Sequence, residues 1–124
     1  MHLLIVPRYA ALLGLLYFTL TVRVIRYRRK HKISLGDGGH ERLQKLMRSH
    51  SNFAEFTPMV LLLLCLVEAK GWPGGVVHGL CCLLTFGRMA HSESLPRASL
   101  GLRVFGMAAT LLSLGISSLL LVIP

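Results

Sequence analysis

The segment from Glu41 to Pro58 combines charged and amide side chains with the start of an apolar run, and their spacing is helical. Arg48, Asn52 and Glu55 are separated by four and then three residues, so they lie on one face of an α-helix. Glu55 stands inside the apolar run, where an unpaired carboxylate is costly. We therefore expect this stripe to face the interior of a helical bundle or an interface between subunits.

Arginines near the ends of other apolar runs could pair with Glu55: Arg23, Arg26, Arg88 and Arg103. Arginines then outnumber carboxylates around the stripe, and a buried excess of positive charge has to be neutralised. The sequence therefore indicates a site for a small anionic ligand. His91 follows Arg88 by about one helical turn and is compatible either with ligand contact or with a plain interfacial position. We interpret the remaining basic residues after the first run as membrane anchors.

Other kinds of chemistry find little support in the sequence. The three cysteines, Cys65, Cys81 and Cys82, lie in apolar runs and lack metal-binding spacing, so we predict no metal site. The glycines between Gly36 and Gly39 are not followed by the Gly-Lys-Ser/Thr sequence of a phosphate-binding loop. No set of serine, histidine and aspartate suggests a nucleophilic enzyme.

The composition indicates the environment of this stripe. The 124 residues are 53% hydrophobic and 15% charged, with a mean hydropathy of +0.61, whereas soluble domains carry about 25% charged residues. The formal net charge is +9. In a soluble protein this charge would suggest nucleic-acid binding, but the apolar runs are too long for that function. We expect a protein embedded in membrane lipid, with no nucleic-acid partner.

Four segments can reach the length of a bilayer span: residues 3–26, 40–69, 75–91 and 99–123. The second needs its polar start, and the third is short. We predict one domain, residues 1–124, with an all-α fold of four transmembrane helices in a bundle. The first segment lacks a basic start and is followed by arginines, so we interpret it as a retained helix and not a signal peptide. The stretches 36–39 and 70–75 predict turns.

Basic residues are distributed unevenly between the two ends of this predicted bundle. Of the 14 Lys and Arg residues, only Arg8 and Lys70 fall at the end that holds the second link, which leaves 12 near the first and third links. Basic residues concentrate on the cytoplasmic side of membrane proteins. We therefore expect the first and third links in the cytoplasm and both termini outside.

The stripe at the start of the second of four spans resembles the MAPEG family, membrane-associated proteins in eicosanoid and glutathione metabolism. The resemblance covers essentially the whole chain and is strongest in Arg48-x-x-x-Asn52-x-x-Glu55 followed by Pro58. The stretch Lys32–Gly39 resembles the bacterial branch of the family. The resemblance implies a homotrimer that binds glutathione as co-substrate between protomers near the cytoplasmic face, with a hydrophobic small molecule as second substrate.

The resemblance also implies a set of glutathione-binding residues: Arg26, Arg48, Asn52, Glu55, Arg88 and His91. It implies Arg103 as the catalytic residue. That role is chemically reasonable, because a nearby guanidinium favours a thiolate over a thiol with an ordinary pKa of about 8.5. Phe56 replaces a tyrosine of some relatives, and Val104 replaces a serine of the prostaglandin-forming branch, so eicosanoid reactions are not supported.

The function expected on these grounds is a glutathione-dependent transferase or peroxidase that acts on a hydrophobic electrophile in a bacterial inner membrane. Two alternatives remain open at this point. A small four-span exporter of drugs and protons has a similar length, but such exporters need an acidic residue in a span, typically the first, which here has none. A membrane subunit without catalytic activity would bind no thiol tripeptide.

Overall fold

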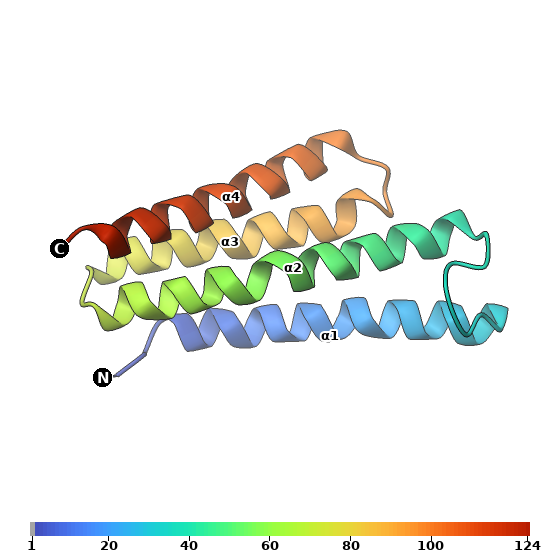
Figure 1. Cartoon of the computed structure of the whole chain (residues 1–124), viewed down its shortest axis with the longest axis horizontal. Coiled ribbons are helices and arrows are strands. Elements are labelled where there is room, and N and C mark those ends of the chain that lie inside the picture. Colours follow the sequence, from blue (N-terminus) through green and yellow to red (C-terminus); the bar gives the residue numbers. More distant parts are fainter. Residues whose placement is uncertain (1) are drawn as a thin grey trace.

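The computed structural model describes residues 2–124 and consists of four helices joined by short links. They are α1 (Val6–His31), α2 (Glu41–Ala69), α3 (Gly74–Ser94) and α4 (Leu100–Val122). The helices run alternately up and down, with both termini at the end that holds the α2–α3 link (Figure 1). The predicted all-α, four-helix membrane bundle is confirmed.

The outer surface of the bundle is apolar along much of its length. Helices α1, α2 and α4 are long and apolar enough to cross a membrane, whereas α3 is not among these candidate spans and ends in a polar stretch. Leu15, Phe18 and Leu119 remain about two-thirds exposed on the single chain. Exposed side chains of this kind are suited to contact with lipid, and such contact accounts for their exposure along the spans.

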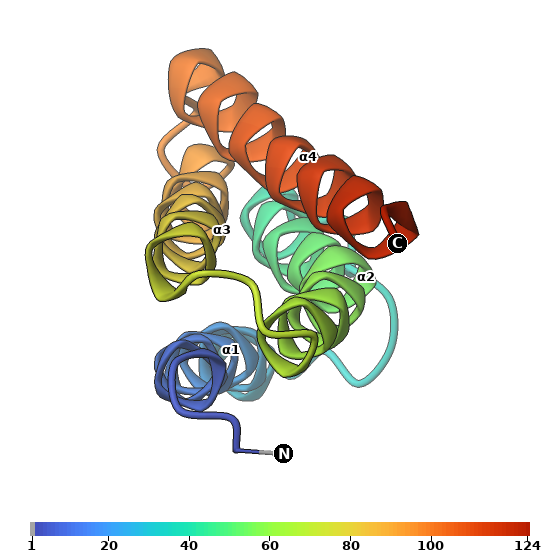
Figure 2. The same ribbon diagram turned by 90° about the vertical axis from the view of Figure 1, so that its left-hand side faces the viewer.

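Helices α2 and α3 form the centre of the bundle, with α1 and α4 on opposite sides (Figure 2). The core contains buried leucines, valines and an aromatic ring from α1, α2 and α3: Leu13, Leu20, Phe53, Val60, Leu64 and Leu84. Helix α4 packs against α3 and α2 through small and hydroxyl-bearing side chains instead. Ser113 on α4 is fully buried and donates a hydrogen bond to the carbonyl oxygen of Leu80, 3.2 Å away.

Glu68, near the end of α2, caps the start of α1. Its Oε1 atom accepts hydrogen bonds from the backbone N–H groups of Leu4 and Ile5, at 2.6 and 2.7 Å. Its Oε2 atom accepts one from the N–H of Val6, at 2.8 Å. The first N–H groups of a helix have no partner within the helix, and a carboxylate there also complements the helix dipole. One side chain thus anchors the N-terminal end of α1 to α2.

Lys70 forms a matching contact with the end of α4. Its Nζ atom donates to the carbonyl oxygens of Leu120 and Leu121, both at 3.3 Å, and also to that of Ile123. A cation is favourable at the carbonyl end of a helix. The turn after α2, in which Gly71 has a φ of +90°, therefore lies between contacts to both outer helices.

Helices α3 and α4 approach each other closely at Gly87 and Gly106. A Cβ atom on Gly106 would lie 2.6 Å from the carbonyl oxygen of Gly87 and 2.7 Å from the backbone nitrogen of His91. A Cβ atom on Gly87 would lie 2.8 Å from the Cβ of Ala109. Only glycine permits this spacing, and the close crossing brings Arg88 and His91 of α3 near the start of α4.

Replacing Gly106 by alanine is expected to lower the free energy of unfolding by about 1–3 kcal/mol, because the new methyl group meets backbone atoms that cannot turn aside. Thermal unfolding in detergent, followed by circular dichroism, measures the change. Gly115→Ala on the same helix is the matched control, since a Cβ there meets nothing within 4 Å. Equal unfolding temperatures for the two variants would contradict the close crossing.

Replacing Glu68 by glutamine is expected to destabilise the fold by about 1–3 kcal/mol, because the amide keeps only one acceptor oxygen and no charge for three N–H donors. Hydrogen exchange of the amides at residues 4–6 should also speed up. The control is Glu41→Gln, a carboxylate whose side chain is 80% exposed. If exchange at these amides is the same in Glu68→Gln as in the unaltered protein, the cap is not formed.

Candidate functional site

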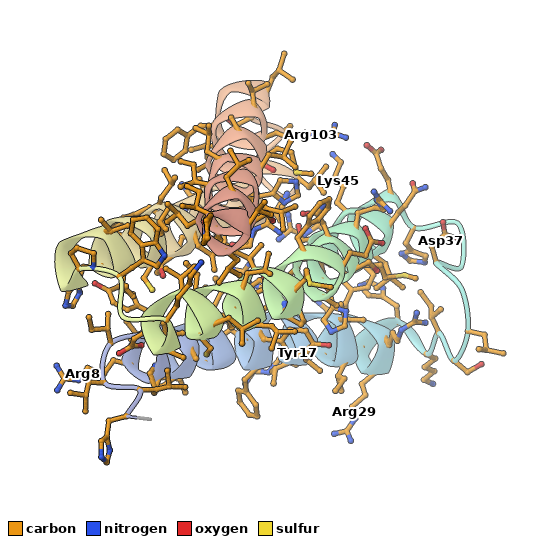
Figure 3. The ribbon with its side chains drawn as sticks, turned by 60° about the vertical axis from the view of Figure 1, so that its left-hand side comes forward. Arg8, Tyr17, Arg29, Asp37, Lys45 and Arg103 are labelled. Carbon is orange, nitrogen blue, oxygen red and sulfur yellow. The ribbon has the colours of Figure 1, made fainter. Side chains whose placement is uncertain are left out.

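A cavity of about 300 Å³ opens between α2 and α4, with α3 behind it. It is lined by residues from all three helices: Asn52, His91, Leu100, Arg103, Val104 and Met107. A smaller hollow of about 200 Å³ adjoins it and shares Leu100 and Arg103, with Lys45 on the α2 side. Figure 3 shows the side chains of Lys45 and Arg103 close together beside α4. We call these two hollows together the α2–α4 cavity.

Arg88 lies behind this cavity as a buried cation. The residue is 1% exposed, and its Nη1 atom donates to the Oδ1 of Asn52 at 2.8 Å and to the Asn52 carbonyl oxygen at 3.2 Å. Its Nε and Nη2 atoms are buried without a hydrogen-bond partner, and its Cζ atom lies 6.0 Å from the centre of the Phe56 ring. Within residues 2–124 no carboxylate forms an ion pair with this guanidinium.

His91 is 5% exposed and lies where several arginine charges converge. The guanidinium groups of Arg48, Arg88 and Arg103 are all close enough to interact with its ring electrostatically. They come from three different helices, since Arg48 is on α2 and Arg103 on α4. The backbone of His91 packs against Gly106, so the close α3–α4 crossing holds the ring at this position. Such a convergence of positive charge is electrostatically favourable for an anion.

The predicted stripe on α2 is only partly buried in the single chain. Asn52 is 8% exposed, whereas Arg48 and Glu55 are exposed. In the part of the chain that the structure describes, the Glu55 carboxylate forms no ion pair. The stripe therefore does not close on the interior of its own protomer, and the other expectation from the sequence, an interface between subunits, stays a prediction.

The residues predicted from the sequence fall into two groups in space. Asn52, Arg88, His91 and Arg103 meet at the α2–α4 cavity. Arg26 lies elsewhere, in a separate cavity between α1 and α2. The single chain thus assembles the centre of the predicted glutathione site without its α1 arginine.

Sequence reasoning missed the role of Glu93. The arginine Arg23 was considered as a partner for Glu55, but it forms its ion pair with Glu93, at 2.7 Å. Arg97 contacts the same carboxylate at 3.3 Å. The spacing of Glu93 and Arg97, four residues apart, was a signal for one of these contacts. The contact from α1 to α3 could not be read from spacing, because it joins distant segments.

The sequence profile of the MAPEG family matches residues 6–123. Inner membrane protein YecN of Escherichia coli strain K12 is 32% identical over 102 residues, which cover 82% of this chain and 78% of the relative. The protein of the same name from Escherichia coli O6:H1 matches equally well. The range that the family profile matches includes all four helices and every residue that lines the α2–α4 cavity.

Asn52→Ala is expected to lower the free energy of unfolding by about 1–3 kcal/mol, because the buried Arg88 guanidinium loses its side-chain acceptor. In an Arg88→Met background the same change should cost little, since no buried charge remains to be satisfied. Unfolding of the four proteins in detergent gives the coupling between the two residues. Additive effects would mean that the hydrogen bond between Asn52 and Arg88 contributes nothing to stability.

Proposed function

Because this chain belongs to the MAPEG family, a family of membrane proteins that includes glutathione-dependent transferases and peroxidases, we propose that it conjugates glutathione to a hydrophobic electrophile. The observation that carries the proposal is the buried Arg88 guanidinium, which has no acidic partner in the described chain and lies behind a cavity lined by Asn52, His91 and Arg103. By analogy with YecN, the membrane would be a bacterial inner membrane.

Glutathione has the charges that this site lacks. It carries two carboxylates and one ammonium group, and arginines bind carboxylates through paired, charge-assisted hydrogen bonds. Arg88 and Arg48 would hold carboxylates, with Asn52 as a further hydrogen-bonding group. The ammonium group would contact Glu55, which is exposed on the same face of α2 as Arg48. In this assignment Glu55 binds the ammonium group of glutathione, which an arginine cannot bind because both groups are cations.

Arg103 is the residue that would activate the thiol. It lies at the mouth of the cavity, in the first turn of α4. Its charge would stabilise the thiolate, and the thiolate sulfur would attack an electrophilic carbon of the second substrate. A carbon–sulfur bond forms while the leaving group departs with its electron pair. The neighbouring Val104 and Met107 would supply an apolar wall for a substrate that enters from the lipid.

A homotrimer would complete the site. Arg48 and Glu55 are exposed on a helix that is apolar enough to cross a membrane, and lipid tails cannot satisfy either group. A second protomer would cover this face and could provide its Arg26 to the same glutathione molecule. This arrangement would explain why Arg26 is remote from the α2–α4 cavity of its own chain.

Glutathione binding and thiol ionisation can be separated by experiment. Arg103→Ala should bind glutathione with nearly unchanged affinity, but it should lose the ultraviolet absorbance of the bound thiolate. Turnover of a chlorinated aromatic should fall by about tenfold or more, because the thiolate loses stabilisation equal to one pKa unit or more. Stopped-flow absorbance and calorimetry measure these quantities. A full thiolate signal in this variant would remove Arg103 from the mechanism.

The binding residues have a separate test. Arg48→Ala and Glu55→Gln should each weaken glutathione binding by about tenfold, as expected for the loss of one charged hydrogen bond. Arg8→Ala is the control, because Arg8 lies at the opposite end of the bundle (Figure 3). Binding without turnover of any electrophile would leave a glutathione-binding protein that is not a transferase. No binding by the unaltered protein would overturn the proposal.

A further inference from the structure

A second, separate cavity of about 490 Å³ lies between α1, α2 and the α3–α4 link. We call it the α1–α2 cavity. Six charged residues line it: Arg23, Arg26, Lys30, Arg42, Arg97 and Glu93. It shares no lining residue with the α2–α4 cavity. The two cavities therefore lie on different sides of α2, and each is bounded by a different outer helix.

The α1–α2 cavity has a large excess of positive charge. Its five cations face one carboxylate, that of Glu93, and this carboxylate is already shared between Arg23 and Arg97. Arg42 donates only to the carbonyl oxygen of Pro96, at the long distance of 3.5 Å. Lys30 has no ion-pair partner within residues 2–124. Five cations on the wall of one cavity repel one another unless an anion lies among them.

The position of this cavity along the bundle indicates where its anion comes from. The apolar run of α1 ends at Val22, and Arg23 begins the basic stretch, so the cavity lies at the level where lipid headgroups meet the hydrocarbon. Below it on the same helix Phe18 is 67% exposed, and Ile25, between Arg23 and Arg26 at the level of the cavity, is 44% exposed. Acyl chains can pack against such side chains while a headgroup reaches the cations. Basic pockets at this level on the cytoplasmic side are typical sites for anionic lipids.

We infer that the α1–α2 cavity binds the phosphate headgroup of an anionic phospholipid from the cytoplasmic leaflet. Lys30 and Arg42 are the two cations that lack a carboxylate and are not used in the proposed glutathione site, so they are the residues on which the inference rests. Arg26 also lines the cavity, but its assignment to glutathione leaves the argument unchanged. The inference can be tested apart from the proposed function, because Lys30 and Arg42 have no part in the proposed glutathione site.

The test uses the full-length protein in detergent, titrated with phosphatidylglycerol and, in parallel, with phosphatidylcholine. Native mass spectrometry counts the retained lipid. Phosphatidylglycerol should be retained preferentially, and Lys30→Ala and Arg42→Ala should each weaken its binding by about fivefold, the effect of about 1 kcal/mol for one basic residue near a charged headgroup. Lys30→Arg should keep the binding, which separates loss of charge from loss of fold.

Arg29→Ala is the matched control. Arg29 is the neighbour of Lys30 and carries the same charge, and both residues are exposed. Arg29, however, lines a different hollow and points away from the bundle (Figure 3). If Arg29→Ala and Lys30→Ala lose equal affinity for phosphatidylglycerol, the lipid responds only to general surface charge, and the inference is overturned. Equal retention of phosphatidylcholine would also overturn it.

Two further arms identify the source of the anion. Inorganic phosphate should not displace the lipid at millimolar concentration, and displacement by it would assign the cavity to a soluble anion. Glutathione should not displace the lipid either. Displacement by glutathione would mean that the α1–α2 cavity is part of the glutathione site and not a lipid site. Glutathione affinity is measured on the same samples, so failure of either proposal is recorded separately from failure of the other.

Discussion

A guanidinium that is buried without a carboxylate is the feature on which the organisation of this site depends. Arg88 of α3 is almost fully buried, and its hydrogen bonds are to Asn52 of α2 alone. Burial of an unbalanced charge is unfavourable, so the fold carries a cost at this point. Proteins accept such costs at functional positions, where a ligand supplies the missing group. The cations that line the α2–α4 cavity, Lys45 and Arg103, add to the same requirement.

The packing of α4 determines whether that requirement can be met by one ligand. Because Gly87 and Gly106 let the helices nearly touch, the start of α4 lies beside the end of α3. A wider spacing would separate Arg103 from His91 and divide the positive charge between two unrelated surfaces. The helix crossing thus determines the shape of the α2–α4 cavity and also contributes to stability, although neither glycine lines that cavity.

Sequence reasoning was sufficient for features that depend on local pattern. Apolar runs identified four helices, and the spacing of Arg48, Asn52 and Glu55 identified one face of α2. Contacts between distant segments were outside its reach, because hydropathy does not say which faces meet. The pairing of Asn52 with Arg88, and of Arg23 with Glu93, belong to this class. The polar stripe was expected to be covered, yet only Asn52 is buried within one chain, and periodicity cannot tell an intramolecular cover from a neighbouring subunit.

The cap that Glu68 forms on α1 bears on how the chain enters the bilayer. The amides of Leu4, Ile5 and Val6 find their acceptor 62 to 64 positions later in the chain. During synthesis α1 is made before α2. Its first amides therefore bind water or headgroups until α2 has been made to its end. The cap can therefore form only once α1 and α2 lie side by side as a hairpin.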